Sequence, residues 1–415
     1  GHSYCLPKIR TNPIDKKIWK LTKPATLNYV MGPVVGMIDT FWIGKLGTIN
    51  QLASSGSADQ LFNMFYMMNI FLPSIVGPKI TELKLLNKTN EIKQLITTSI
   101  ILTNMLSLFS MYIMIFYHSN LLNLFLGNNS VLYSEAREYF VYRTFGICFS
   151  LNNCMMFGIL RGFMEINYAT KIIFKSQMIN IVLNPFFMLL FGIKGVAIAS
   201  VLSDVYACYK YTNLFIDKNL FTKKINHFIK KSLLLFKQGT FIQIKNILVQ
   251  LMYLYTTNCV SSMDTCGELL GCHIVIIKLI QLTQISYGGL YSVSNVLIPY
   301  EKINNNDKVV ISYLLKWGFY VGIIQSILIY FIREQLHFFV NEENIVTIKS
   351  LIQPICIYQC IYGIGHIFEG ILQGYQKFKY SFIGSMIHII PTFFILYFSK
   401  TLCELWYYCI IPLLL

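Results

Sequence analysis

KPATLNYVMGPVVGMIDTFWIGKLG, at residues 23–47, is the segment from which the class of this chain follows. From Pro24 to Gly44 it holds about twenty residues of overwhelmingly apolar composition, enough at about 1.5 Å per residue to cross a hydrocarbon core of about 30 Å. The segment is therefore predicted to be a membrane-spanning helix.

Asp39 is the one acidic side chain inside this predicted span. A charge at mid-bilayer costs on the order of 3 kcal/mol unless it faces protein or water, so Asp39 needs a partner. One interpretation is an interfacial carboxylate near the outer end of the span. The other, which we favour, is a cation or proton site in an internal cavity.

The composition of the whole chain agrees with a membrane protein. Of 415 residues, 55% are hydrophobic and 13% are charged, whereas charged residues make up about 25% of a soluble domain. A net charge of +15 would suggest nucleic acid as the partner of a soluble protein. Because no basic face interleaved with aromatic residues lies outside the spans, we expect no nucleic-acid partner.

The eleven cysteines form no C-x-x-C pair, and most fall in apolar segments. They are interpreted as small buried hydrophobes, and no metal site is expected, because no His or carboxylate completes the Cys356 and Cys360 pair. The first residues show neither an initiator Met nor a signal peptide, which is typical of an excerpt from a longer chain.

Apolar runs bounded by charge or by Pro and Gly predict eleven complete spans. They lie near residues 17–43, 51–78, 94–117, 138–160, 170–191, 195–216, 232–258, 268–299, 309–332, 346–372 and 380–399. A twelfth begins near Leu402 and is cut off at Leu415, so the last span is incomplete. The sequence thus predicts an all-α, multi-pass membrane protein.

Basic residues alternate between the two sides of these spans. The N-terminal segment and the loops near 79–93, 161–175, 210–237, 302–316 and 377–379 hold 25 of the 34 Lys and Arg residues. Cytosolic loops carry such an excess, so the N-terminus is predicted to be cytosolic. The sequence does not distinguish the plasma membrane from an organellar one.

The chain also repeats itself. Gly158-Ile-Leu-Arg-Gly162 recurs 212 residues later as Gly370-Ile-Leu-Gln-Gly374, and residues 16–24 match residues 231–239. Two lobes of six spans in parallel orientation are predicted: residues 1–217, a cytosolic linker at 218–230, and residues 231–415. The glycine pairs, like Gly32 and Gly36, are small-xxx-small motifs, for which helix packing is the simplest interpretation.

No Walker A, G-x-S-x-G, H-E-x-x-H or Rossmann motif occurs, so the chain is not expected to be an enzyme. The candidate functional residues are polar groups inside spans. In the first half they are Asp39, Asp59, Asn63, Gln177, Asn180, Asn184, Ser200 and Asp204. In the second half they include Gln243, Lys245, Gln250, His273, Lys278, Gln281, Gln284, His366 and Glu369.

Two pairs among these residues have informative spacing. Asn180 and Asn184 share a helix face just before Pro185, so amide oxygens and a freed carbonyl could bind a small cation. His366 and Glu369 are i,i+3 neighbours, which is compatible with a proton relay or with an ordinary interhelical hydrogen bond.

Several of these segments together resemble a known family. IDTFWIGKLG at 38–47, with Gln51-Leu-Ala after it, is similar to the first-span signature of the multidrug and toxic compound extrusion (MATE) family, in its DinF-like branch. RGFMEINYAT at 161–170, NIVLNP at 180–185 and GVAIASVLS at 195–203 resemble the fourth to sixth spans of that branch. EGILQG at 369–374, with Phe378 and Tyr380, resembles its tenth span.

The resemblance implies two six-helix lobes around a V-shaped cavity and antiport of an organic solute against H⁺ or Na⁺. It also implies a cation-linked cluster of a first-span Asp with a fifth-span Asn-x-x-x-Asp-Pro. Asp39 and Asn180 match this pattern, but Asn184 stands where the branch has its second Asp. The loss of one carboxylate weakens a Na⁺ site more than a proton site.

The predicted cation-coupling group is therefore Asp39, Asn180, Asn184, Ser200 and Asp204. The predicted cavity residues are Asp59, Asn63, Gln177, Gln243, Lys245, Gln250, His273, Lys278, Gln281 and Glu369. We expect a monomer surrounded by membrane lipid, with no cofactor apart from the coupling ion. Burial beside Asn180 and Asn184 disfavours the ionised form of Asp39, so proton coupling with a bend at Pro33 is the working hypothesis.

One neighbouring interpretation stays open, namely a lipid or lipid-linked oligosaccharide flippase of similar topology. A pyrophosphate-binding cavity would be rich in Arg and Lys, whereas only two such residues, Lys245 and Lys278, are assigned to the interior of the spans and not to the loops and span ends. These lysines are expected to face the cavity and to favour anionic or zwitterionic groups on the solute. A membrane enzyme or a structural protein would need a catalytic constellation or an external domain, and the sequence shows neither.

Overall fold

The computed structural model describes residues 13–47, 49–126, 130–223, 228–263, 268–333 and 342–410. The regular structure of these residues is helical. The helices are α1 (Pro13–Leu46), α2 (Ile49–Asn69), α3 (Phe71–Leu85), α4 (Thr89–Phe116), α5 (His118–Leu126), α6 (Ser130–Thr144), α7 (Ile147–Gly162), α8 (Ile166–Phe191), α9 (Ile193–Asp217), α10 (Phe228–Met263), α11 (Glu268–Ile303), α12 (Asp307–Ile332), α13 (Glu342–Gly374), α14 (Phe378–Leu396) and α15 (Leu402–Ile410).

Each predicted span corresponds to one helix or to two consecutive helices. The second span consists of α2 and α3, and the fourth consists of α6 and α7, while the short α5 is an additional helix. Within the described residues, six helical segments are long and apolar enough to cross a membrane: Ser54–Leu85, Thr89–Phe116, Ile166–Phe191, Asp307–Ile332, Lys349–Gly374 and Phe378–Leu396. The all-α class is confirmed.

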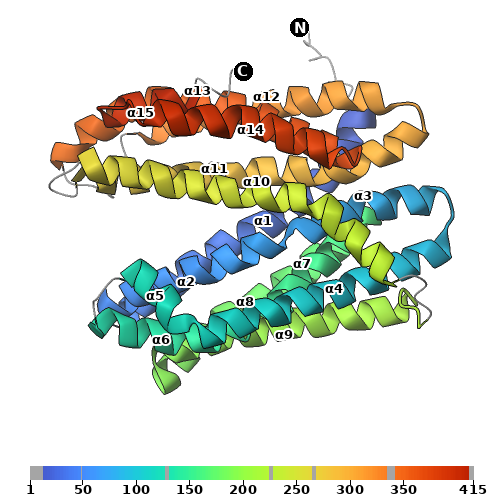
Figure 1. Ribbon diagram of the computed structural model, residues 1–415, viewed down its shortest axis with the longest axis horizontal. Helices are drawn as coiled ribbons and strands as arrows, with labels where there is room; N and C mark the ends of the chain where they lie inside the picture. The colour runs from blue at the N-terminus through green and yellow to red at the C-terminus, as the bar shows by residue number, and fades with distance from the viewer. Residues whose placement is uncertain are drawn as a thin grey trace, which may run out of the picture.

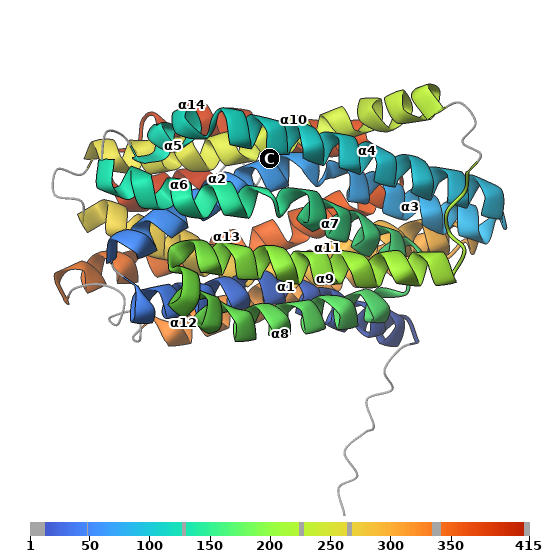
Figure 2. The ribbon, with the colours of Figure 1, turned by 90° about the horizontal axis from the view of Figure 1, so that it is seen from below.

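The helices form two groups that run along a common direction (Figure 1, Figure 2). Helices α1–α9 make up lobe 1, and helices α10–α15 make up lobe 2. Each group has an apolar core of its own, around Leu61 and Phe140 in the first and around Ile355 and Trp406 in the second. A third core, which contains Ile18, Phe71 and Ile367, joins the groups near the linker between α9 and α10. Two separate cores at one end and a shared core at the other are what a V-shaped arrangement requires.

The first helix of each lobe crosses to the other lobe. The start of α1 lies against lobe 2, where Lys17 forms an ion pair with Glu301 on α11 and the Trp19 ring meets the Trp317 ring edge-on at 4.8 Å. The start of α10 lies against lobe 1, where Lys231 donates a hydrogen bond to Gln94 on α4. The predicted repeat of residues 16–24 at 231–239 thus marks two equivalent crossings in a pseudo-symmetric fold.

The glycine motifs lie at equivalent helix contacts in the two lobes. A Cβ atom on Gly162 of α7 would be 2.6 Å from the carbonyl oxygen of Gly77 on α3. A Cβ atom on Gly374 of α13 would be 3.0 Å from the Cβ atom of Ile298 on α11. Packing is therefore the role of this repeated motif.

The third glycine motif does not follow this rule. A Cβ atom on Gly32 or Gly36 would meet no atom within 4 Å outside its own helix. The expectation that this pair packs a neighbouring helix was wrong, because α1 presents this face to open space. The residues that bring α1 against its neighbours lie nearer its start, where Thr26 approaches Gly289 and Tyr29 approaches Gly288.

Candidate functional site

Asp39 lies on α1 beside the predicted pair of asparagines on α8. The side-chain amide of Asn184 donates a hydrogen bond to Asp39 Oδ1. Asn180 and Asn184 are both buried, and the side-chain oxygen of each has no hydrogen-bond partner among the described residues. The structure thus brings the Asp39 carboxylate together with the Asn184 amide, and the second buried amide, Asn180, lies one turn earlier on the same helix.

Asp59 belongs to the same region, although the sequence analysis assigned it to the solute cavity. It lies on α2, and Tyr139 on α6 donates a hydrogen bond of 2.9 Å to its Oδ1 atom. The carboxylates of Asp39 and Asp59 interact electrostatically. Lobe 1 therefore holds a pair of interacting carboxylates, Asp39 and Asp59.

Arg143 is the central residue that the sequence analysis missed. Its Nη1 atom lies 3.2 Å from Asp204 Oδ2, and its guanidinium lies 3.9 Å from the centre of the Phe62 ring. Its charge also acts on Asp39 and Asp59, so the three carboxylates share one cation. Arg143 falls inside the predicted span 138–160, and a charge at that depth was the available signal.

The break between α6 and α7 shapes the surroundings of Asp204. Ser150 Oγ donates a hydrogen bond of 2.6 Å to Asp204 Oδ2, and Asn153 Nδ2 donates one of 3.0 Å to its backbone carbonyl. A Cβ atom on Gly146, at the break, would lie 2.6 Å from Arg143 Nη1. Glycine therefore leaves the space that the guanidinium occupies. Asp204 is held by these groups and not by the Asp39 and Asn184 pair with which it was predicted to act.

The other predicted residues of lobe 1 have less defined roles. Ser200 is buried on α9, one turn before Asp204. Gln177 is partly buried on α8, and Asn63 is exposed on α2. Within the described part of the chain, no hydrogen bond or ion pair joins these three side chains to the carboxylates.

In lobe 2, Lys245 on α10 and Glu369 on α13 form an ion pair, with both side chains mostly buried. Gln373, one turn after Glu369, donates a hydrogen bond of 2.9 Å to Glu369 Oε1. His366 Nδ1 lies 3.9 Å from Glu369 Oε2, which is too far for a hydrogen bond. The pair His366 and Glu369 is thus neither a direct relay nor a hydrogen bond in this structure.

The imidazole of His366 belongs to a column of stacked rings. It stacks on Tyr291 at 4.6 Å and on Tyr362 at 5.5 Å, and Tyr362 stacks on Tyr358 at 5.4 Å. Tyr358, Tyr362 and His366 are spaced four residues apart on α13, so their rings follow one helix face. The column ends beside the Lys245 and Glu369 ion pair.

A chain of hydrogen bonds leads from this ion pair to the contact between the lobes. Tyr291 OH donates a hydrogen bond of 2.5 Å to Gln373 Oε1. Asn295 Nδ2 donates to the same oxygen at 3.4 Å. It also donates to the Ser74 carbonyl on α3 at 3.3 Å. Arg161, 3% exposed at the end of α7, donates to Ser292 on α11 and to the Pro73 carbonyl, each at 3.1 Å.

Among the residues that the structure describes, His273, Gln243 and Gln250 have no hydrogen bond to this network. His273 is buried on α11 and packs against Trp406 at 5.7 Å between ring centres. Gln243 is partly buried and Gln250 is exposed, both on α10. The side chains of Lys278 and Gln281 lie outside the described residues. In the part of the chain that is described, no group of His, Cys, Asp and Glu is arranged to hold a metal ion.

Two helical lobes that enclose buried ionisable groups define a multi-pass membrane protein with the two-lobe transporter fold. A family model described as MatE matches residues 24–186, the part that contains Asp39, Arg143 and Asn184. This part of the chain is thus similar to the MATE family, whose members are transporters and not enzymes. The resemblance to the MATE family noted in the sequence is thereby confirmed, whereas the assignment to its DinF-like branch stays a prediction.

Individual relatives agree with this assignment. Protein DETOXIFICATION 43 of Arabidopsis thaliana is 25% identical over 287 residues, which are 53% of this chain and 54% of that protein. The match thus spans about half the length of this curated relative. A solved structure described as the outward-facing conformation of a multidrug resistance MATE family transporter covers 97% of this chain and 93% of its own, with a TM-score of 0.85 and 18% identity.

A second solved structure, described as MATE in complex with MaD5, covers the whole of this chain and 95% of its own. Its TM-score is 0.85 and its sequence identity is 17%. These structural similarities establish the fold over the full chain, including the second half that lies beyond the family match.

Proposed function

We propose that the protein is a secondary active antiporter that exports an organic solute in exchange for protons by alternating access. The observation that carries this proposal is the arrangement of charge in lobe 1. Arg143 pairs with Asp204, while Asp39 and Asp59 receive hydrogen bonds from Asn184 and Tyr139 and have no ion-pair partner within the described residues. One cation thus balances one carboxylate, and two carboxylates are left to take up and release protons.

The contact of Asn184 with Asp39 supports protons as the coupling ion. The amide nitrogen, not the amide oxygen, faces the carboxylate, whereas a Na⁺ ion is held by several oxygen atoms. The positive charge of Arg143 nearby also opposes entry of a second fixed cation. Protonation needs a single carboxylate oxygen and meets neither obstacle.

Sodium coupling is the second candidate, and a separate observation favours it. The side-chain oxygens of Asn180 and Asn184 are buried without hydrogen-bond partners among the described residues. Two such oxygens on one helix face beside a carboxylate are suitable ligands for a small hard cation. An ion-specific transport assay distinguishes the two candidates.

The experiment uses purified protein in liposomes, a panel of organic solutes and separately imposed pH and Na⁺ gradients. Asp39→Asn is expected to abolish export driven by a pH gradient while solute counterflow continues, because counterflow needs solute binding but no ion gradient. Asp217→Asn, the same chemical change at the exposed end of α9, is the matched control and should transport normally.

Asn184→Asp adds a second carboxylate beside Asp39 and should increase the dependence on Na⁺. Unchanged pH-driven export by Asp39→Asn would refute coupling through this carboxylate. Export by the unaltered protein that follows the Na⁺ gradient and ignores the pH gradient would favour the second candidate.

The ion pair of lobe 2 bears on the class of solute. Lys245 was expected to favour anionic groups, but Glu369 balances its charge. We infer that lobe 2 imposes no preference for net negative charge and that the solute is neutral or zwitterionic. Saturable counterflow of a zwitterion in the panel, with weaker counterflow of a matched anion, supports this inference, and the reverse order contradicts it.

The flippase interpretation receives less support. A pyrophosphate group would need unpaired Arg and Lys side chains, whereas Arg143 and Lys245 are each paired with a carboxylate. The residues that resemble the DinF-like branch, above all Asp39 and Asn180, also occupy the proposed ion site.

We further propose that the N-terminus and the linker between α9 and α10 are cytosolic. The basis is the clustering of 25 of the 34 Lys and Arg residues on this side of the spans. An epitope inserted between residues 218 and 223 should be labelled only after the cytosolic face is exposed. Labelling of intact membranes from the opposite face would reverse the orientation.

A further inference from the structure

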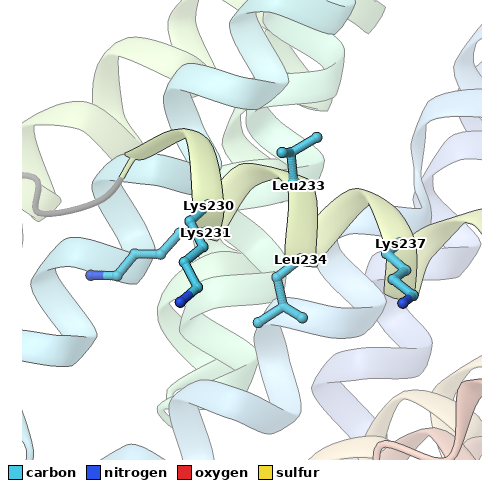
Figure 3. A pocket seen from close by; sticks show the side chains of 5 residues that line it. All are labelled: Lys230, Lys231, Leu233, Leu234 and Lys237. Atoms are coloured by element: carbon cyan, nitrogen blue, oxygen red, sulfur yellow. The ribbon is translucent and has the colours of Figure 1, made fainter.

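The first turns of α10 form an open groove of about 480 Å³ at the crossing between the lobes. It is lined by Lys230, Lys231, Leu233, Leu234 and Lys237 (Figure 3). The side chains of Lys231, Leu234 and Lys237 extend from the same side of the helix. Basic and apolar side chains thus alternate along one short surface, and the proposed transport mechanism uses none of them.

The apolar part of this surface faces outward. Leu233 is 63% exposed, Leu234 is 51% exposed and the neighbouring Ile229 is 73% exposed. The opposite face of the same turns is buried, because Leu235 and Ile242 pack into the core that joins the lobes. Large apolar side chains that face outward on a helix entering the membrane are suited to contact with lipid acyl chains.

The lysines of this surface lie at different depths. Lys237 follows Lys230 by seven residues, about 10 Å along the helix axis, so its backbone lies deeper in the membrane than the first turn. A lysine at that depth extends its ammonium group back toward the polar layer.

The structure provides no carboxylate for these cations. Lys231 donates a hydrogen bond to the uncharged Gln94, and within the described residues none of the three lysines has an ion-pair partner within 4 Å. Elsewhere at this end of the molecule, lysines do find carboxylates, as Lys17 does with Glu301 and Lys218 does with Glu165. The α10 surface is therefore an unbalanced positive site.

We propose that this surface binds an anionic phospholipid. Lys230, Lys231 and Lys237 contact the phosphate and the anionic headgroup, while Leu233 and Leu234 contact the acyl chains. A cluster of lysines beside exposed leucines, where a helix enters the membrane, matches both halves of such a lipid. A soluble phosphate would use the lysines but not the leucines.

The position of the site gives the lipid a structural role. α10 leaves lobe 1 at this point, with the Phe71 and Phe236 rings in contact at 6.2 Å and Lys79 donating to Gln238 at 2.6 Å. A lipid bound to these turns contacts the helix that joins the two lobes. Its binding therefore stabilises the arrangement in which the lobes are closed at the linker end.

The test is a binding titration on the purified full chain in detergent, read by thermal unfolding and by native mass spectrometry. Dioleoylphosphatidylglycerol is compared with dioleoylphosphatidylcholine. Lys230→Gln with Lys237→Gln is the test variant, and it leaves Lys231 and its hydrogen bond intact. Lys171→Gln with Lys175→Gln, two exposed lysines near the start of α8, is the control with the same change in charge.

The unaltered chain and the control should bind phosphatidylglycerol more tightly than phosphatidylcholine. The test variant should bind phosphatidylglycerol about thirtyfold more weakly, because each lysine near an anionic headgroup contributes roughly a fivefold gain. Equal binding by both variants would overturn the proposal, as would equal affinity for the two lipids. Binding of sn-glycerol 3-phosphate as tight as that of phosphatidylglycerol would instead assign the site to a soluble anion and overturn the lipid assignment.

Discussion

Arg143 illustrates how single side chains are accommodated in this membrane protein. Its guanidinium forms an ion pair with Asp204 and lies over the Phe62 ring. It occupies space that a side chain at Gly146 would fill. Lys245 is accommodated in the same way by Glu369. Charged side chains at membrane depth are tolerated when protein groups replace the water that they lose.

The pairing of Arg143 with Asp204 predicts a coupled effect on stability. Arg143→Met leaves Asp204 buried without its cation, and we expect a loss on the order of 3 kcal/mol, because breaking one side of a buried pair strands the other charge. Combining Arg143→Met with Asp204→Asn should recover most of this loss. The measurement is the apparent unfolding temperature of the purified protein.

Arg137→Met provides the control for this pair of variants. Arg137 lies on the same helix but is exposed, and its contact is a hydrogen bond of 3.1 Å to His118. It should change the unfolding temperature little. If the double variant is no more stable than Arg143→Met alone, the stranded carboxylate is not the cause of the loss.

At the scale of helices, close contacts between α7 and α3 and between α13 and α11 hold each lobe together. The spans exclude water, so burial of apolar surface adds little to the packing of helices within a membrane, and close approach of backbones matters more. Gly162 and Gly374 provide that approach at equivalent places in the two lobes.

This contact predicts a difference between two glycine substitutions. Gly162→Ala would place a Cβ atom 2.6 Å from the Gly77 carbonyl oxygen, a backbone atom that cannot rotate away, and should destabilise the protein by about 1–3 kcal/mol. Gly32→Ala meets open space and should be neutral or slightly stabilising, since alanine favours helix over glycine. Thermal unfolding compares the two, and equal losses would contradict the packing role of Gly162.

At the scale of the whole molecule, polar contacts between the lobes gather near the linker between α9 and α10. They include the Lys17 and Glu301 ion pair, the Asp15 and Trp317 hydrogen bond of 2.7 Å, and the hydrogen bond from Gln376 to Glu82 of 2.5 Å. Under the proposed alternating access, these contacts would separate when the lobes open at this end. We therefore expect them to set the balance between the two conformations.

Glu301→Gln should weaken this contact. The lost attraction to Lys17 favours separation of the lobes, and the backbone amides at the start of α1 should exchange hydrogen several-fold faster in deuterium-exchange mass spectrometry. Glu91→Gln breaks the exposed Lys88 and Glu91 pair within lobe 1 and serves as the control. Unchanged exchange at residues 15–22 in Glu301→Gln would mean that the ion pair does not hold the lobes together.

The sequence by itself determined the all-α membrane class and the pseudo-symmetric arrangement of two lobes. These features depend on hydropathy and on local spacing, which the chain carries in consecutive residues. The sequence also indicated Asp39, Asn180 and Asn184, because polar groups in apolar spans and a one-turn spacing are both visible locally.

The partners of the charged groups were decided by the tertiary structure. Arg143 and Asp204 are 61 residues apart, and Lys245 and Glu369 are 124 residues apart, so no periodicity connects them. The same holds for Gly32 and Gly36, whose spacing is that of a packing motif but whose face meets no neighbour. Helical spacing fixes which residues share a face, whereas the packing of whole helices fixes what that face meets.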